Sequence, residues 1–434
     1  MERIATKKRN AKGASTKGSF SSLNSVEMEV SESYVRLCGE VSNFTKEKTG
    51  TSFVDAYFGP EHLGPDYQSK KKDPEELIYE IEGLIDSVKQ EIQSTIKSKH
   101  LIGDCLSMKL VVEWLNGKRM SYADLVQGIF HIPIKRFPEG IIDEAILSLD
   151  EALTGYSGDA LRDRVEKFTK EGEITGSELK KLVETELQQK AISVGQLFRD
   201  RIYSLVGTSV TDNGVEYQTV TGAPWSGYNW YQKGFKSLNQ FNLDVTFNKN
   251  SLQGVIYHEY EHHVSNLWRE KYYLENGDLE LSVVPLHTGR CVISEGTADT
   301  ARDFLGVKEE DPHISIDSAL YNLRRMTSIN AAIMLNEERK SANDAIEYIY
   351  DRGFRTRKSA ETSIGFIAPK TPDGRPNFWA PYVFTYFFGR TDFVLPTFNK
   401  AIETDQLARF YQTLYLNPYS GSSVTWKEAF SWLD

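Results

Sequence analysis

Cysteine is scarce in this chain. Its three cysteines, Cys38, Cys105 and Cys291, lie far apart among 434 residues, and no two have a Cys-x-x-Cys spacing. An odd number at these distances argues against a disulfide framework and against a zinc site built from thiolates. The N-terminal residues also lack the apolar core of a secretory signal. We therefore expect a protein of a reducing compartment, the cytoplasm.

The sequence also lacks a long apolar run and an excess of positive charge. Its most apolar stretch, residues 378–389, has 12 residues, whereas a membrane-spanning helix needs about 20. With 51 basic and 61 acidic residues, the formal net charge is −10. Such a balance disfavours general binding to nucleic acid or to an anionic membrane. We expect neither partner, and the pattern indicates no particular oligomeric state.

Helical periodicity is what the first half of the chain does have. Residues 1–24 are rich in Lys, Ser, Gly and Thr, which is typical of a disordered basic tail. Over 75–96, apolar residues recur at steps of three and four, and Asp73-Pro74 is typical of a helix start. A second helix is predicted over 176–205. We expect residues 25–206 to form an N-terminal helical region.

The character of the sequence changes near Gly207, and 207–434 is expected to form a second region. Residues 241–247 alternate between apolar and polar, which predicts a strand. A turn at 248–250 and a helix capped by Ser251 should follow. Most of the remainder has helical periodicity, for example 318–351, apart from a Pro- and Gly-rich loop at 368–377. The predicted fold is therefore mainly α (α+β), with a small sheet.

The segment with the clearest chemistry is Tyr257–His263, with the sequence Tyr-His-Glu-Tyr-Glu-His-His. On a helix, His258 and His262 lie one turn apart on one face, so both imidazoles can reach one ion. Zinc suits two imidazoles, a carboxylate and an open position for water, whose proton a nearby carboxylate accepts. Spacing alone does not choose between Glu259 and Glu261 for that role. An ordinary exposed or core pair of histidines is the simpler alternative.

A third ligand must complete such a site. One common zinc-peptidase pattern needs a histidine ten residues after His258, but that position is Trp268. Another pattern uses a glutamate on a following helix, and Glu295 lies 33 residues beyond His262. Asp299, one turn later, could accept the free ring N–H of a ligand histidine. The small residues at 296–298 would let this helix approach the first one closely.

Together these motifs resemble those of the gluzincins, the thermolysin-like branch of zinc peptidases, over about residues 236–306. The resemblance implies that His258, His262 and Glu295 bind Zn²⁺, that Glu259 is the general base, and that Asp299 orients a ligand histidine. It also implies a zincin-like catalytic region within 207–434, a cleft against the N-terminal helices, and hydrolysis of a peptide substrate.

Other segments resemble less typical zinc proteins. The helix-rich surroundings are similar to those of oligopeptidase-type zinc proteins. Residues 55–60 and 224–231 resemble segments of a less-characterised group, whose motif often carries a Pro-Gly insertion that this chain lacks.

Peptide binding and oxyanion stabilisation should need further groups. In zincins a peptide can add to an edge strand, for which 241–247 or the segment just before it could serve; an ordinary core strand is the alternative. For the oxyanion donor we predict Tyr386, with Tyr382 and Arg390 on neighbouring turns of the same face. His263 and His287 are further candidates, and the aromatic residues could instead be core.

Two other functions compete with the peptidase. The chain could be an inactive helical binding or scaffold protein with a structural zinc, closed by a fourth ligand such as His263, Glu261 or Asp299. It could also be a metal hydrolase acting on a non-peptide amide. The motif favours an enzyme, because it places a base beside the metal and supplies no obvious fourth ligand.

Overall fold

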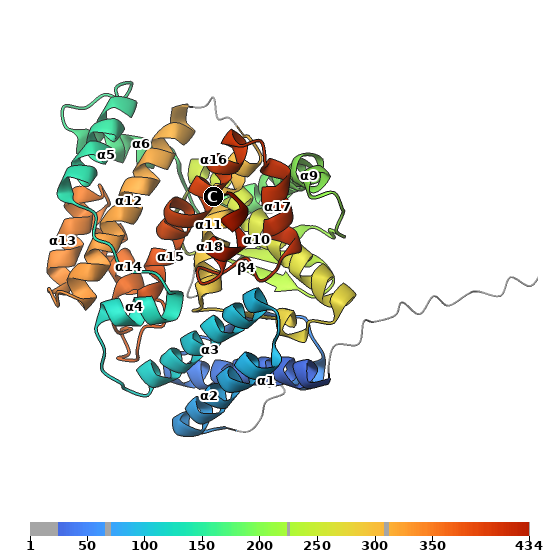
Figure 1. Cartoon of the computed structure of the whole chain (residues 1–434). Helices are drawn as coiled ribbons and strands as arrows, with labels where there is room; N and C mark the ends of the chain where they lie inside the picture. The colour runs from blue at the N-terminus through green and yellow to red at the C-terminus, as the bar shows by residue number, and fades with distance from the viewer. Residues whose placement is uncertain (1–24, 66–70, 224–225, 308–311, 434) are drawn as a thin grey trace, which may run out of the picture.

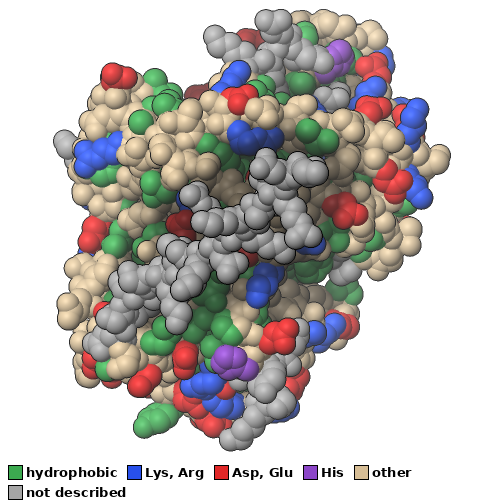
Figure 2. All heavy atoms as spheres, turned by 90° about the vertical axis from the view of Figure 1, so that its right-hand side faces the viewer, with side chains coloured by type: hydrophobic (Ala, Val, Ile, Leu, Met, Phe, Trp, Pro, Cys, Tyr) green, Lys and Arg blue, Asp and Glu red, His purple; other side chains and the backbone are tan. Residues whose placement is uncertain are grey.

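The computed structural model describes residues 25–65, 71–223, 226–307 and 312–433 (Figure 1). The predicted tail at 1–24 lies outside these described residues. The described chain is mainly helical with small sheets, which confirms the predicted mainly α class. None of the helices in these ranges combines the length and apolarity needed to cross a membrane. On the face in Figure 2, acidic and basic side chains are interspersed.

The N-terminal part begins with a series of helices and one short strand. The predicted helix over 75–96 starts as expected, with Asp73 at the N-cap and Pro74 in the first turn, but it ends at Glu91. Ser94 then caps a new helix, and Ile92 stays buried, so the apolar pattern continues across the break. The elements are α1 (Ser25–Thr49), β1 (Val54–Tyr57), η1 (Glu61–Leu63), α2 (Pro74–Glu91), α3 (Thr95–Leu115), α4 (Tyr122–Phe130), α5 (Glu139–Ala152), α6 (Leu161–Glu171) and β2 (Glu173–Ile174).

A continuous helical run then leads to the largest sheet, as the periodicity over 176–205 predicts. The run consists of α7 (Gly176–Lys181), η3 (Leu182–Leu187), α8 (Gln188–Phe198), η4 (Arg199–Tyr203) and α9 (Ser204–Val206). Three strands follow: β3 (Val215–Val220), β4 (Gly227–Gln232) and β5 (Lys236–Asn242). Their order is β3-β5-β4, with β5 parallel to β3 and antiparallel to β4.

The prediction of one strand over 241–247 is wrong. Strand β5 ends at Asn242, because the Asn242 side chain accepts a hydrogen bond from the Asp244 amide at 3.0 Å and its carbonyl accepts one from Val245 at 3.2 Å. These two bonds form a turn. Phe241 and Phe247 meet across it with ring centroids 5.9 Å apart, which accounts for the apolar alternation without a strand.

The second half contains the motif helix and most of the C-terminal helices. The motif helix starts two residues before the predicted Ser251 cap, and the helical stretch at 318–351 is divided by a capping box at Ser341. The elements are β6 (Phe247–Asn248), α10 (Lys249–Asn276), η5 (Leu279–Ser282), β7 (Val283–Pro285), α11 (Gly289–Phe304), α12 (Pro312–Asn336), α13 (Ala342–Arg352), α14 (Arg357–Ile367), η6 (Ala380–Tyr382), α15 (Val383–Phe388), η7 (Gly389–Val394), α16 (Leu395–Glu403), α17 (Leu407–Leu416), α18 (Trp426–Ala429) and η8 (Ser431–Leu433).

Helix α11 lies between the two largest apolar clusters. Val292 belongs to the cluster that joins α1–α4 to α12–α15, whereas Ile293 belongs to the cluster that joins residues 174–206 to α10 and the C-terminal helices. The first cluster therefore contains residues from both sides of the predicted domain boundary at 206/207. The division of the chain into two regions at that point stays a prediction. Helices α10 and α11 pack directly on each other near the centre of the molecule (Figure 1).

Candidate metal centre

Helices α10 and α11 bring three potential metal ligands together. His258 and His262 lie on α10, and their Nε2 atoms are 3.1 Å apart. Glu295 on α11 places its Oε2 atom 3.4 Å from the first Nε2 and 3.6 Å from the second. Among the described residues, this is the group of side chains that could hold a metal ion.

The spacing of these three atoms fits zinc. A tetrahedral zinc ion with bonds of about 2.0–2.1 Å keeps its ligand atoms roughly 3.3 Å apart, and the observed separations are 3.1, 3.4 and 3.6 Å. Glu295 Oε2 is buried and has no hydrogen-bond partner in the described part of the chain. An unsatisfied buried carboxylate oxygen is costly, and a bound cation would remove that cost.

Each ligand is held in orientation by a second group. Asp299 Oδ1 lies 2.8 Å from His258 Nδ1, as the sequence predicted, and this contact turns Nε2 toward the other ligands. Ser294 Oγ lies 3.2 Å from His262 Nδ1. The Tyr382 hydroxyl donates a hydrogen bond of 2.8 Å to Oε1 of Glu295, which leaves Oε2 free. Sequence reasoning missed the Ser294 and Tyr382 contacts.

The electrostatics of the cluster favour added positive charge. Burial acts to lower the pKa of His258, but Asp299 and Glu295 raise it well above the ordinary value. Burial likewise acts to raise the pKa of Glu295, yet the two neighbouring histidines hold it well below the ordinary value. The carboxylates thus favour positive charge on the two histidines, and a divalent cation would compete with the histidine protons.

The two glutamates of the motif have different surroundings. Glu259 lines the cavity beside the ligands and makes no hydrogen bond among the described residues, and burial raises its pKa. Glu261 is completely buried and accepts hydrogen bonds from Ser265 Oγ at 2.6 Å, Thr297 Oγ1 at 2.9 Å and Tyr415 OH at 3.3 Å. The sequence spacing could not choose between these two carboxylates as the base. Their contacts distinguish them, because only Glu259 faces the cavity without a hydrogen bond in the described part of the chain.

The ligands open onto a cavity of about 150 Å³. Residues from β1, β4, α11 and the segment 379–386 complete the wall. They include Asp55, Gly227, Tyr228, Asn229, Asn266, Leu286, Arg290, Cys291, Trp379, Tyr382 and Tyr386.

The structure separates the predicted oxyanion donors. Tyr386 lines the cavity, and its hydroxyl makes no hydrogen bond within the described ranges. Tyr382 is bound to Glu295, as described above. Arg390 donates to the Asp299 carbonyl at 2.8 Å and does not line the cavity. Tyr228, which sequence reasoning did not single out, also lines the cavity and donates a hydrogen bond to Asp55.

The two remaining histidine candidates are buried elsewhere. His263 is fully buried between Ser237 and Asp212, with its ring nitrogens 2.9 and 3.0 Å from their side-chain oxygens. His287 is fully buried against Phe378. Neither lines the cavity. His263 and Glu261 are therefore bound to groups other than the ligand cluster.

A close contact between backbones positions the tyrosines. The small residues at 296–298 were expected to face α10, and Thr297 does so through Glu261. Gly296 instead faces Gly389, where a Cβ would lie 2.4 Å from the Gly389 carbonyl carbon. Only glycine permits this approach, which brings the end of α15 and the start of η7 directly against α11.

Comparisons with known proteins provide a fold and no function. No protein-family model matches the chain, and no curated protein matches it. A solved protein of Colwellia psychrerythraea, described as a "putative lipoprotein", has 15% identity and a TM-score of 0.50, with 83% of this chain and 70% of that one covered. A "putative lipoprotein of unknown function" from Shewanella oneidensis has 12% identity, a TM-score of 0.42, and coverage of 83% and 72%. At 15% identity, the first likeness concerns the fold alone.

Proposed function

We propose that this protein is a zinc-dependent peptidase with a gluzincin-like, zincin-type catalytic region. The observation that carries the proposal is the spacing of 3.1–3.6 Å among the ligand atoms of His258, His262 and Glu295, beside the free carboxylate of Glu259. A structural zinc site would be closed by a fourth protein ligand, and the described residues offer only three.

The residues around the cavity have separate roles in this proposal. The three ligands hold Zn²⁺, which when bound lowers the pKa of water and polarises a carbonyl group. Glu259 accepts the proton of the attacking water and passes it to the leaving amine, and its raised pKa suits both transfers. Tyr386 donates its hydroxyl proton in a hydrogen bond to the developing oxyanion of the substrate. Asp299 keeps His258 in the required tautomer.

Strand β4 is the best position for an extended peptide. Strand β5 pairs on both sides, so it has no free edge, whereas β4 lies at the edge of the sheet. Gly227, Tyr228 and Asn229 of this strand line the cavity. A peptide added along β4 would be held by main-chain hydrogen bonds while its scissile bond faces Glu259. Residues 241–242 and the segment just before them belong to β5, so the edge-strand role considered for 241–247 and that segment passes in this proposal to β4.

Metal content and peptide cleavage test the proposal together. We expect about one zinc per chain by elemental mass spectrometry, and cleavage of a mixed peptide library that is lost with the metal in His258→Ala. Absence of zinc after add-back would refute the metal site. One zinc per chain without cleavage of any peptide would instead support a structural zinc or a non-peptide amide substrate.

A further inference from the structure

A second pocket adjoins the proposed catalytic cavity. Arg290 and Ser294 line both, and Ser294 also contacts the ligand His262. Arg290 and Ser294 are four residues apart on α11, which separates them by one turn, about 6 Å along the axis. The pocket is small, with a volume of about 60 Å³. It therefore begins one helical turn from a group that touches the metal site.

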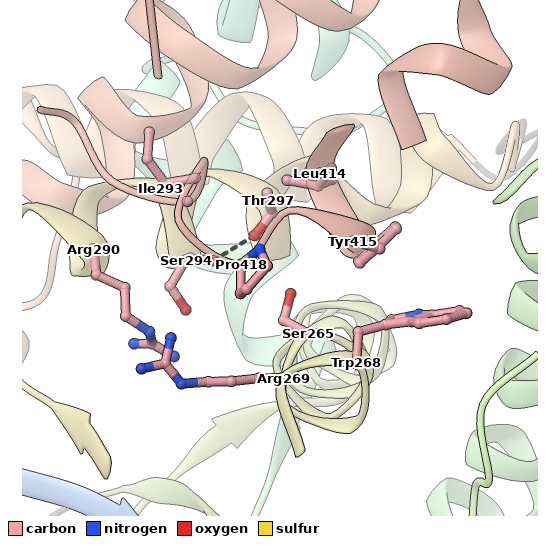
Figure 3. Close-up of a pocket in the computed structure, with 11 residues that line it drawn as sticks. Ser265, Trp268, Arg269, Arg290, Ile293, Ser294, Thr297, Leu414, Tyr415 and Pro418 are labelled. Atoms are coloured by element: carbon pink, nitrogen blue, oxygen red, sulfur yellow. Dashed lines mark hydrogen bonds between the residues drawn. The ribbon is translucent and has the colours of Figure 1, made fainter. Parts of the chain in front are cut away.

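One end of this pocket carries two arginines (Figure 3). Arg269 is 7% exposed, and it donates to the carbonyls of Leu281 at 2.8 Å and Val283 at 3.0 Å through Nε and Nη2. The Arg290 guanidinium has no hydrogen-bond or ion-pair partner among the described residues. Both guanidinium groups lie together, on the side away from Trp268. Burial, and then the charge of Arg290, lower the pKa of Arg269 to about 10.

Such a pair is unusual unless an anion joins it. Two neighbouring cations without a bound carboxylate repel each other, and partial burial strengthens the repulsion. Two carboxylates interact electrostatically with the pair, Asp104 with Arg269 and Asp55 with Arg290. Among the described residues neither is hydrogen-bonded to an arginine: Asp104 accepts from Tyr34, and Asp55 accepts from Tyr228. The position of Arg290 in the first turn of α11 adds the positive end of a helix dipole. Positive potential is thus concentrated one turn from the metal site.

We propose that Arg290, supported by Arg269, binds the free α-carboxylate at the C-terminus of a peptide substrate. This inference rests on the proposed peptidase function and names its substrate class. The planar guanidinium matches a carboxylate with two parallel hydrogen bonds. Because Arg290 lines both the pocket and the metal cavity, the enzyme would cleave close to the C-terminal end of its substrate.

The remainder of the pocket is small and partly apolar. Trp268, Leu414 and Tyr415 line its side away from the arginines, and Pro418 lies between the two sides (Figure 3). A small apolar side chain would therefore be preferred for the terminal residue. A free N-terminal ammonium, by contrast, would be repelled by the two arginines, so this arrangement does not fit an aminopeptidase.

Binding can be measured apart from turnover. The probes are N-acetyl-Ala-Ala-Ala with a free carboxylate and the same peptide as its C-terminal amide. Calorimetry uses the zinc-loaded Glu259→Gln protein, in which hydrolysis should be too slow to interfere. We expect the free acid to bind on the order of 10- to 100-fold more tightly, the usual contribution of a charged hydrogen-bonded pair. Adding Arg290→Gln should remove the preference, Arg290→Lys should keep part of it, and Arg357→Gln, an exposed arginine of α14, should keep all of it.

Equal binding of acid and amide would overturn the inference, whatever the wild-type protein hydrolyses. The same conclusion follows if Arg290→Gln binds zinc normally and keeps the preference. Carboxylate-dependent binding without wild-type cleavage of either peptide would leave the carboxylate site standing and refute the peptidase. If the Arg290→Gln variant does not fold, the comparison of acid and amide binding to the Glu259→Gln protein still tests whether a carboxylate site exists.

Discussion

Exchanging each motif glutamate for glutamine should separate catalysis from stability. Glu259→Gln and Glu261→Gln make the same chemical change two residues apart on α10. Glu259 faces the metal cavity without a hydrogen bond among the described residues. Glu261 is completely buried under three hydroxyl donors. If the proposed roles are correct, the two variants should have opposite phenotypes.

The expected magnitudes follow from these contacts. Loss of a general base typically reduces turnover 10²- to 10⁴-fold, which corresponds to about 3–5 kcal/mol of barrier. Glu259→Gln should lose that much while keeping its zinc and its stability, because no hydrogen bond is broken. In Glu261→Gln the amide NH₂ cannot accept from the hydroxyls that face it. At least one bond is lost, so the free energy of unfolding should fall by about 1–3 kcal/mol, with turnover changed only a few-fold.

Three measurements on the same preparations decide the matter. Turnover is measured on a peptide that the wild-type protein cleaves, zinc by elemental mass spectrometry, and the free energy of unfolding by urea titration. More than a tenth of wild-type turnover in zinc-loaded Glu259→Gln would refute the assigned base. If Glu261→Gln were inactive at unchanged stability, the base would be Glu261 and the described orientation of the two side chains would be wrong.

Three further substitutions test the surroundings of the site. Tyr382→Phe removes the donor to Glu295 and should weaken zinc binding 10- to 100-fold in a chelator competition; an unchanged Kd would contradict this. Gly296→Ala places a Cβ 2.4 Å from facing backbone and should cost about 1–3 kcal/mol in urea unfolding, whereas Gly365→Ala, with no atom within 4 Å, should not destabilise. Burial lowers the pKa of His287 to about 3, so the unfolded chain, with a pKa near 6.5, binds the extra proton and stability falls as pH decreases below 6.5. Between pH 7 and 5 the wild-type protein should lose about 2 kcal/mol more than His287→Gln, and equal losses would refute the assignment.

The proximity of the proposed metal ligands was predictable because the relevant geometry is local. Histidines four residues apart share a helix face in any helix, so the spacing of His258 and His262 already fixes their proximity. Glu295 could be proposed because the second motif resembles that of a family. In the structure, Glu295 does lie on a helix, α11, that packs against α10. Asp299 could be proposed for the same reason, because it lies four residues after Glu295 and therefore one helical turn further on the same face.

Contacts between distant segments could not be predicted in this way. Nothing in the motif indicates that Tyr415 would reach Glu261, or that Tyr382 would bind Glu295 and leave Tyr386 at the cavity. The strand predicted at 241–247 failed for a related reason. An alternation of apolar and polar residues indicates which side chains are buried, but it does not show which backbone conformation buries them. Here a turn brings Phe241 against Phe247, as a strand could also have done.

Helix α11 explains why these separate features converge on one site. It contributes to both main apolar clusters, so its position relative to α10 is fixed from two sides. Gly296 allows η7 to contact its backbone, which places the tyrosines beside Glu295. Its first turn carries Arg290, its middle carries the ligand, and its next turn carries Asp299. The proposed metal binding, the orientation of His258 by Asp299 and the proposed recognition of the substrate carboxylate thus depend on one helix. For that reason a change in the register of this helix would impair all three together.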